Sequence, residues 1–294
     1  MAVVENHLIA LLPRVDRLRL LALCEPVQLV LSEVLCEAGA QVHHAYFPVD
    51  GFISLVTRVD NHPGVEVGMI GREGMLGVQL ALGVAVAPLH ALVQGPGMAW
   101  RIGAVALRRE LARSTALQRN VNHYLYVLMT QLTISAACVR FHQIGPRLAR
   151  WLMMSEDRAH TNRFRVTHEF LAYMLGVRRV SITAAAGGLQ RSGLIEYRRG
   201  DLTVLDRKGL AAVACSCYAA GQRAYAEQWP RSRHDRMSAP RTESGSFGTI
   251  EVPADALWGA QAVEENRQRQ TEERPAIGSG SGFQGSATSG RHQI

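Results

Sequence analysis

Four polar side chains that suit nucleic-acid chemistry lie close together: Arg178, Arg179, Ser181 and Thr183. An arginine guanidinium can donate two parallel hydrogen bonds to a guanine or a phosphate, and a hydroxyl group can bond a base or the backbone. Such contacts need the side chains to project from one rigid element, and the surrounding sequence predicts that element.

Residues 166–205 predict a helix, a tight turn, a second helix and a two-stranded β-ribbon. Apolar residues fall on one face of a 3.6-residue period, and Thr167 can cap the start, so the first helix should run from about His168 to Leu175. Gly176 then allows a sharp turn, because glycine adopts a left-handed backbone without steric cost.

The second helix should begin near Arg178 and turn Val180, Ile182 and Leu189 inward. The remaining side chains near its N-terminal end would then face outward, where this motif contacts bases in a major groove. These candidate base-contacting residues are Arg178, Arg179, Ser181 and Thr183.

The ribbon that follows should turn at Gly200-Asp201 and carry Arg198 and Arg199 near its tip, where they would suit phosphate contacts. Thr167 and His168, at the start of the first helix, complete the candidate DNA-binding set. The order of elements is that of a winged helix-turn-helix and predicts a DNA-binding regulator. The alternative is an ordinary pair of helices with solvated arginines.

Composition is compatible with a polyanionic partner. The chain has 294 residues, 47% of them hydrophobic, with 32 Lys and Arg against 25 Asp and Glu and a net charge of +7. Lys208 is the only lysine. Arginine favours bidentate contacts to guanine and phosphate, although a GC-rich coding bias would give the same excess.

The chain lacks the usual signals for export or membrane insertion. No run approaches the ~20 apolar residues of a membrane span, and charges interrupt the N-terminus, so we expect a cytoplasmic protein with no membrane partner. The cysteines show neither a disulfide framework nor zinc spacing, and we expect no metal. They are Cys24, Cys36, Cys138, Cys215 and Cys217. An incidental Cys215/Cys217 pair is favoured over a redox site.

Two further regions differ in periodicity. Residues 27–105 contain short apolar stretches separated by Gly, Pro, Asp and Asn, which predicts a sandwich or roll of short strands. Residues 115–141 predict one helix of about 27 residues with an apolar stripe at heptad spacing. Self-association through this stripe is favoured over packing within one domain. The stripe consists of Val121, Leu125, Leu128, Leu132, Ser135 and Val139.

This order of parts resembles the Crp/Fnr family of bacterial transcription regulators over residues 1 to about 213. The most specific stretches are YFPVDGFISLV (46–56), VEVGMIGREGMLG (65–77) and VTHEFLAYMLGVRRVSIT (166–183). The resemblance implies an α+β chain that binds a palindromic operator as a homodimer, with RNA polymerase as a possible further partner. It also implies that Arg179 takes the place of the family's guanine-contacting arginine.

By the same resemblance, the chain divides into four parts. These are a cyclic-nucleotide-binding-like β-roll, or double-stranded β-helix, over 1–114, a dimerisation helix over 115–142, a winged helix-turn-helix over 143–213 and a low-complexity tail over 214–294. We expect the tail to be disordered.

Departures from the family pattern are informative. Cyclic-AMP-responsive members carry a glutamate and a further arginine where this chain has Val180 and Ala184, so the operator should differ. Ala87-Pro88-Leu89-His90 replaces the Arg-Ser pair that holds the cyclic phosphate, so we do not expect cyclic AMP as the ligand. The resemblance still places the effector pocket at Gly71, Glu73, Gly74, His90 and Thr133.

No cofactor is expected with certainty. Cys24 and Cys36 cannot supply the four thiolates of an N-terminal iron–sulfur cluster. His90 would replace the missing arginine only if protonated, and a neutral histidine is the alternative. A haem ligand among the N-terminal histidines is left open, and so is a regulator without any effector.

Residues 241–261, RTESGSFGTIEVPADALWGAQ, resemble the N-terminus of class II fumarases. The remainder of that family's sequence, including its catalytic serine loop, has no counterpart in this chain. We therefore expect no enzyme activity. The alternatives are an enzyme or metabolic adaptor that uses this tail, and a docking peptide built around Phe247 and Trp258.

Overall fold

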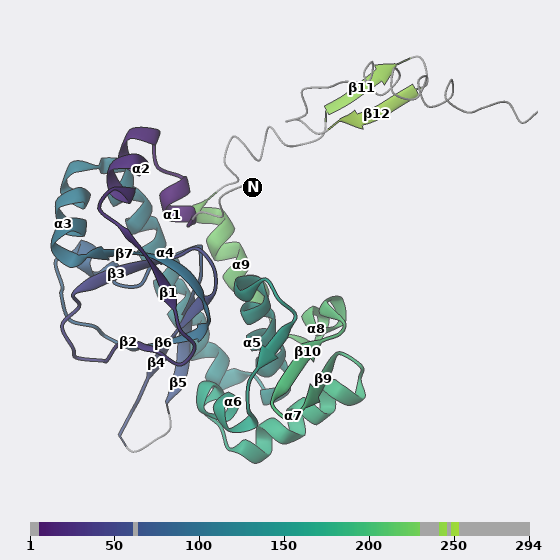
Figure 1. Cartoon of the computed structure of the whole chain (residues 1–294). Coiled ribbons are helices and arrows are strands. Elements are labelled where there is room, and N and C mark those ends of the chain that lie inside the picture. The colour runs from purple at the N-terminus through teal and green to yellow at the C-terminus, as the bar shows by residue number, and fades with distance from the viewer. Residues whose placement is uncertain (1–5, 61–63, 230–240, 246–247, 253–294) are drawn as a thin grey trace, which may run out of the picture. The chain divides into compact units, whose positions relative to one another are not determined.

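The computed structural model describes residues 6–60, 64–229, 241–245 and 248–252. The chain forms two compact units, Met1–Trp229 and Pro230–Ile294. The first unit contains a pair of antiparallel sheets, a long helix and a group of shorter helices with a small third sheet (Figure 1). This architecture confirms the predicted α+β class, with a β-roll, a long helix and a winged helix-turn-helix.

The β-roll follows two short helices, α1 (His7–Ala10) and α2 (Arg14–Leu21). One sheet has the order β1-β7-β3, with β1 at Glu25–Leu29, β3 at His44–Pro48 and β7 at Gly97–Gly103. The other has the order β2-β6-β4-β5, with β2 at Val34–Cys36, β4 at Phe52–Thr57, β5 at Val65–Ile70 and β6 at His90–Gly95. A 3₁₀ helix, η1 (Val78–Leu82), lies between β5 and β6.

The two sheets form a roll because their apolar side chains alternate toward a shared interior. Leu29 of β1, Ile53 of β4, Ile70 of β5 and Val93 of β6 are almost completely buried in one cluster. The chain passes from the second sheet to the first between β6 and β7, with Pro96 as the only intervening residue. The prediction of a strand-rich region over residues 27–105 is therefore confirmed.

The long helix has the predicted bounds. After α3 (Ala104–Arg113), the side chain of Ser114 accepts a hydrogen bond from Leu117 N and caps α4 (Thr115–Phe141). The chain leaves helical geometry at His142, which has φ −107° and ψ 143°. Gly145 and Pro146 lie in the first turn of α5 (Ile144–Ala159), where proline has no intrahelical hydrogen bond to lose.

Helix α5 lies between the β-roll and the remaining helices. Leu148 and Leu152 of α5 share one buried cluster with Val56 and Met69 of the second sheet and with Ile182 of the helix-turn-helix. The elements around it are α6 (His168–Leu175), α7 (Arg179–Arg191), the three strands β8 (Arg163–Arg165), β9 (Ile195–Arg198) and β10 (Asp201–Val204), and α8 (Arg207–Val213). A continuous core therefore connects the β-roll with the helix-turn-helix.

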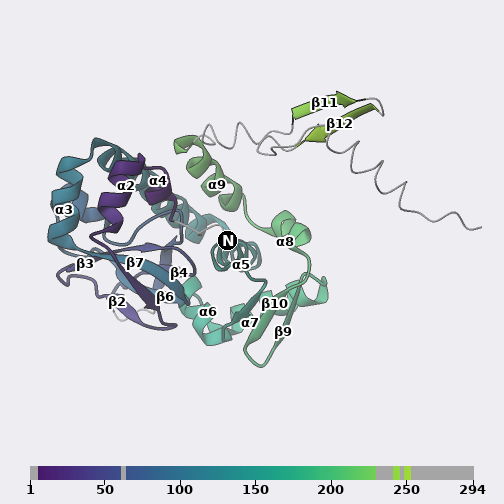
Figure 2. The same cartoon turned by 45° about the horizontal axis from the view of Figure 1, so that its top comes forward.

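The first unit extends beyond the boundary predicted at residue 213. Helix α9 (Cys217–Gln228) packs against α4 and α5 (Figure 2). Tyr225 bonds the ring nitrogen of His7 at 2.8 Å and stacks on Trp229 with ring centroids 4.9 Å apart. The start of the predicted tail is therefore part of the folded first unit, and these aromatic side chains contribute to its packing.

The second unit is described only over a backbone hairpin. Strands β11 (Arg241–Gly245) and β12 (Gly248–Val252) pair antiparallel within the segment that resembles fumarases. The rest of the predicted low-complexity tail, including Phe247 and Trp258, lies outside the described residues.

By length and composition alone, α4 is the one helix among the described residues that could cross a membrane. Core helices of soluble proteins meet the same criterion. Val121 and Tyr124 of α4 are buried in the core formed with α1, α3 and η1, whereas Tyr126 and Met129 are exposed.

Candidate functional site

Helices α6 and α7 form the predicted helix-turn-helix. Thr167 caps α6 by accepting a hydrogen bond from Phe170 N at 3.1 Å. Gly176 ends α6 with φ 62°, a left-handed conformation in which a side chain would be strained. Arg178 then occupies the N-cap position of α7 in an extended conformation. The predicted bounds of the first helix and the predicted turn are therefore confirmed.

The exposed face of α7 differs in part from the prediction. Arg178, Arg179 and Thr183 are exposed as expected. Val180, which we predicted to face inward, is 70% exposed, while Ser181 is half-buried. The buried face is set by Ile182, Ala186 and Leu189, and a residue two positions before Ile182 lies about 200° around the helix from it. Val180 therefore belongs to the outward surface.

His168 joins α6, α7 and the small sheet instead of pointing freely outward. Its ring stacks on Tyr197 with centroids 4.4 Å apart, and its Nδ1 atom lies 3.0 Å from Thr183 Oγ1. Burial, together with the positive charge of Arg179, lowers the pKa of His168 below its ordinary value. A neutral His168 is therefore held within the domain by Tyr197 and Thr183, and its contact with DNA stays a prediction.

The small sheet has three strands, one more than predicted. β10 pairs with β9 on one side and with β8 on the other. The turn lies at Arg199-Gly200, whose φ values are 50° and 91°, and Asp201 already pairs with Arg198. The predicted tip at Gly200-Asp201 is therefore shifted by one residue. Two consecutive positive φ values are typical of the tight hairpin turns whose backbone twist matches that of the flanking strands.

A row of arginines crosses the exposed face of this sheet. Asp201 pairs with Arg165 of β8 and with Arg198 of β9, so the three side chains share one face. Arg163 lies two residues before Arg165 and shares that face, whereas Leu202 is completely buried on the other. Sequence reasoning missed Arg163 and Arg165, although the alternation Arg-Phe-Arg is a strand signal.

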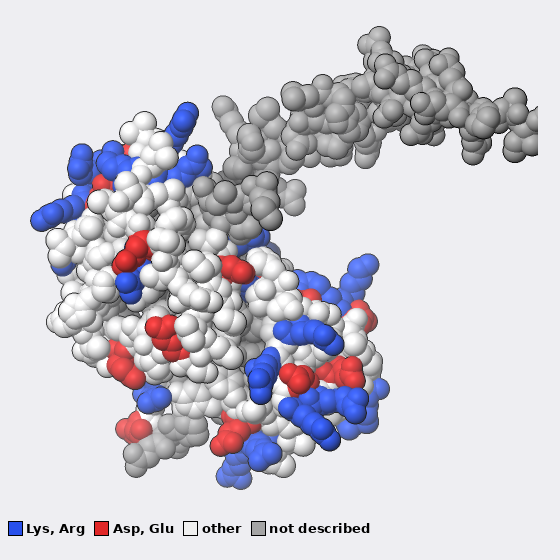
Figure 3. Space-filling model, viewed as in Figure 1, with Lys and Arg blue, Asp and Glu red and all other residues white. Residues whose placement is uncertain are grey.

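Basic side chains gather in two places on the face shown in Figure 3: around α2 and α3, and over the helix-turn-helix with its small sheet. Some acidic groups lie among the second set. Arg178, Arg179, Arg198 and Arg199 are exposed and none is in an ion pair with a described residue. These guanidinium groups are free to contact phosphates or bases.

A cavity of about 310 Å³ lies between the β-roll and α4. Its lining is largely apolar and includes Leu55, Ile70, Leu125, Leu128 and Leu132. The polar and polarisable side chains of the lining include Gln41, Gln79, His43, His44, Tyr46 and Cys36. Among the described residues that line it, there is no Lys, Arg, Asp or Glu.

The five residues predicted to bind an effector do not line this cavity. Glu73 accepts hydrogen bonds from Gly71 N and from Arg158 of α5, with a closest ion-pair distance of 2.7 Å. His90 is buried against Glu37 at 2.6 Å. Thr133 is exposed and donates to Met129 O. In the structure each of these polar groups therefore has a partner within the protein, and their role in effector binding stays a prediction.

Gly74, the remaining member, is a packing residue. A Cβ atom at this position would lie 2.2 Å from ring carbons of Tyr124, which is only 3% exposed and has little room to move. We expect Gly74→Ala to lower the free energy of unfolding by about 1–3 kcal/mol. Urea denaturation measures this change, and Gly221→Ala, where no atom lies within 4 Å of the added carbon, is the control. Equal stabilities of the two variants would contradict the prediction.

The predicted dimer residues of α4 mostly face their own protomer. Val121 is completely buried, Leu125 and Leu128 pack against core clusters of the roll, and Leu132 lines the cavity. Of the predicted residues only Val139 is well exposed, at 45%. The apolar stripe thus packs largely against the β-roll of its own chain, and dimerisation through it stays a prediction. A second set at heptad spacing is exposed instead, here called the outer stripe: Tyr126, Met129, Thr133 and Ala136.

The β-roll also contacts the helix-turn-helix directly. Arg58, just after β4, donates to Tyr173 Oη of α6 at 3.2 Å, and a Cβ atom on Gly176 would contact Val65 of β5. Nearby, Ser54 Oγ donates to Glu66 Oε2 at 2.6 Å. Burial raises the pKa of Glu66 from 4.5 to about 7, although Ser54 and the charge of Arg150 act in the opposite direction.

Glu66 should make stability depend on pH. Because its folded-state pKa is raised, its favourable contribution is complete below the unfolded value of 4.5 and is lost as pH rises through about 7. The variant Glu66→Gln stays neutral at every pH. We therefore expect its stability relative to the parent to increase by about 1–2 kcal/mol from about pH 5 to about pH 8. Urea denaturation at both pH values measures this difference. An equal stability difference at the two pH values would contradict it.

The cysteines also differ from the prediction. The fold brings Cys138, Cys215 and Cys217 together with His142, so that one ligand atom of each lies within 4.8 Å of the others. The sequence signals were a Cys and a His four residues apart on one helix and a Cys-x-Cys pair. Neither signal is specific by itself. Cys138 and Cys215 are 77 residues apart, so the sequence does not show that the two signals meet.

A β-roll, a long helix and a helix-turn-helix with a basic wing are together typical of one class of DNA-binding transcription regulators. Residues 146–213 match the Crp-like helix-turn-helix domain family. The chain therefore carries a Crp-like DNA-binding domain within the fold of the Crp/Fnr family regulators. No curated protein matches the sequence.

Solved structures support this fold. A protein from Eubacterium rectale assigned to the Crp/Fnr family has a TM-score of 0.56 at 16% identity, covering 69% of this chain and 94% of that one. FixK2 from Bradyrhizobium japonicum has a TM-score of 0.56 at 11% identity, covering 66% and 98%. The c-di-GMP-responsive global regulator CLP from Xanthomonas campestris has a TM-score of 0.55 at 16% identity, covering 66% and 100%.

Proposed function

We propose that the protein is a transcription regulator that binds a palindromic operator as a homodimer. The observation that carries this proposal is the exposed N-terminal end of α7, which carries Arg178 and Arg179, in a domain whose small sheet also bears exposed arginines. A helix of this kind inserts its N-terminal residues into a major groove, while neighbouring basic groups hold the phosphates.

The exposed side chains divide into two groups by chemistry. Arg179 would donate to a guanine, and Val180 would contact a thymine methyl group, because its exposed side chain is apolar. Arg198 and Arg199 of the wing, together with Arg163 and Arg165, would contact phosphates. Thr167 and the amide groups at the start of α6 would add a further phosphate contact.

Dimerisation would use the outer stripe of α4. Tyr126 and Met129 are 56% and 58% exposed, and Thr133 and Ala136 continue the same face at heptad spacing. Exposed aromatic and apolar side chains along a helix of this length favour a partner helix, and a second copy of α4 supplies a matching surface. A dimer would present two α7 helices to the two halves of an operator.

The cavity between the roll and α4 would hold the effector. Because no charged side chain lines it among the described residues, an uncharged and largely apolar molecule fits better than a cyclic nucleotide, whose phosphate would lack a counter-charge. The direct contacts of Arg58 and Val65 with the helix-turn-helix give such a molecule a route to influence DNA binding. We place the protein in the cytoplasm, with RNA polymerase as its further partner.

Selection of bound DNA from a random duplex pool tests the proposal. The full chain and residues 1–229 should each enrich a symmetric motif with half-sites about one helical turn apart. A parallel selection with added cyclic AMP should give the same motif and the same enrichment. The absence of any motif, with and without candidate effectors, would overturn the proposed function.

A further inference from the structure

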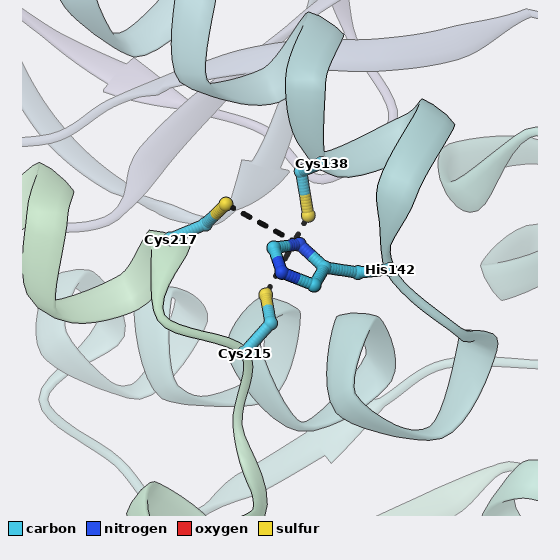
Figure 4. Close-up of side chains that lie close together, drawn as sticks. All are labelled: Cys138, His142, Cys215 and Cys217. Atoms are coloured by element: carbon cyan, nitrogen blue, oxygen red, sulfur yellow. Dashed lines mark hydrogen bonds between the residues drawn. The ribbon is translucent and has the colours of Figure 1, made fainter.

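A cluster of four side chains lies where the long helix meets the DNA-binding part of the chain. Cys138 belongs to the last turn of α4, and His142 directly follows that helix. Cys215 lies in the short connection after α8, and Cys217 is the first residue of α9. Figure 4 shows that the four side chains point toward a common centre from these separate elements.

Local structure explains why the side chains converge. Residues four apart on a helix lie on the same face, so Cys138 and His142 lie next to each other at the end of α4. The His142 amide donates to Cys138 O at 3.1 Å, which fixes the end of the helix. The Cys215 amide donates to Pro146 O at 3.2 Å, which holds the second pair of cysteines against the start of α5.

The distances suit one tetrahedral ion. Cys138 Sγ lies 3.5 Å from Cys215 Sγ, and Cys217 Sγ lies 3.5 Å from His142 Nδ1. All four ligand atoms lie within 4.8 Å of one another. Zinc bonds of about 2.3 Å to sulfur and about 2.0–2.1 Å to nitrogen give tetrahedral edges of about 3.8 Å and 3.6 Å. Small adjustments would therefore complete the coordination.

The surroundings supply charge compensation. Three thiolates and one Zn²⁺ carry a net charge of −1, and the cysteines are at most 9% exposed. Arg147 is only 5% exposed, donates to Leu175 O and forms no ion pair with a described carboxylate. Arg150, which donates to Ser135 Oγ at 3.2 Å, lies on the same helix. Arg147 directly follows Pro146, whose carbonyl group accepts from the Cys215 amide, so an anionic metal centre would stabilise this buried guanidinium.

Other uses of the cluster account for less of this arrangement. A disulfide between Cys138 and Cys215 would leave Cys217 and His142 without a role and would remove the negative charge near Arg147. A polynuclear iron–sulfur cluster places its ligands on different iron atoms, so the four ligand atoms would have to be farther apart. One histidine and three cysteines form a closed ligand set of the kind that structural zinc sites use.

We propose that Cys138, His142, Cys215 and Cys217 bind one Zn²⁺ ion in each protomer. The ion would join the end of α4 to the segment that follows α8, and would thereby fix α9 and the junction between the long helix and the DNA-binding domain. All four coordination positions would be occupied by protein, so the site would be structural. This inference is independent of the proposed function, because it needs neither an operator nor an effector.

Metal analysis of the full-length protein tests the site. The protein, purified under reducing conditions without chelator, should contain about one zinc per protomer by mass spectrometry. Replacement by Co²⁺ should give the visible absorption of a tetrahedral thiolate site. Competition with a chromophoric chelator should show that Cys215→Ser lowers zinc affinity by more than about 100-fold, since even outer-shell changes cost 10- to 100-fold. Cys36→Ser, outside the cluster, should leave content and affinity unchanged.

A second variant separates metal loss from misfolding. His142→Cys should retain zinc and shift the Co²⁺ spectrum, because a fourth thiolate replaces the imidazole, whereas His142→Ala should lose affinity. Addition of a chelator should lower the Tm of the parent but leave that of Cys215→Ser unchanged. Less than about 0.2 zinc per protomer after reconstitution, equal affinities of Cys215→Ser and Cys36→Ser, or a stoichiometric Cys138–Cys215 disulfide without metal would each overturn the proposal.

Discussion

Replacing Arg179 with alanine is expected to weaken binding to the selected operator by about 5- to 150-fold for each half-site, and to leave binding to random DNA nearly unchanged. The range corresponds to the ~1–3 kcal/mol of one bidentate contact between an arginine and a guanine. Arg179 is exposed at the first position of α7, where a side chain can reach a base edge. The preference at one base position of each half-site should also relax.

Arg199→Ala provides the matched control. This arginine lies in the wing turn, and its side chain is exposed. Its loss should weaken all sequences alike and reduce the slope of log affinity against log salt by about 1 for each contacted phosphate. Titrations of operator and random duplexes at several salt concentrations separate the two variants. If both variants lost the same factor on both duplexes, the separation into base and phosphate contacts would be wrong.

The second large effect concerns the outer stripe. Tyr126→Glu should convert the protein to a monomer and weaken operator binding by more than about 100-fold, because one half-site contributes only part of the specific affinity. Two copies of the new carboxylate would face each other across the symmetric seam and lose water there, which is unfavourable. Sedimentation equilibrium and titration of the operator measure the two consequences.

Val105→Glu is the control for this substitution. Val105 on α3 and Tyr126 on α4 are both 56% exposed, so each variant places a carboxylate on an equally accessible surface. The control should remain dimeric and bind the operator as the parent does. A dimeric Tyr126→Glu protein with full affinity would show that α4 does not form the seam.

The prediction from sequence was most successful where the signals are local. The bounds of α6, the cap at Thr167 and the turn at Gly176 follow from residues within one or two helical turns of each other. The turn of the wing was misplaced by one residue, because Arg199 adopts a positive φ that its type does not favour. The strand β8 was missed, because its three residues give too short a pattern.

At the sites, the differences between the expected and the observed surroundings of the residues share one cause. On α4 the apolar stripe through Val121 was taken as the surface for a second copy, but the roll of the same protomer covers it. The predicted effector residues Glu73 and His90 have partners in Arg158 and Glu37, which lie 85 and 53 residues away in the sequence. Periodicity shows that a face is buried, but it does not identify what buries it.

The sequence by itself determined the class of the elements, the helix-turn-helix and the basic outward end of α7, because capping, turn chemistry and helical period act over a few residues. Only the tertiary structure decided which face of α4 is exposed, which cavity the roll encloses, and that Cys138 and His142 meet Cys215 and Cys217. These features depend on packing between segments separated by many residues. Burial of apolar surface over the whole unit drives that packing.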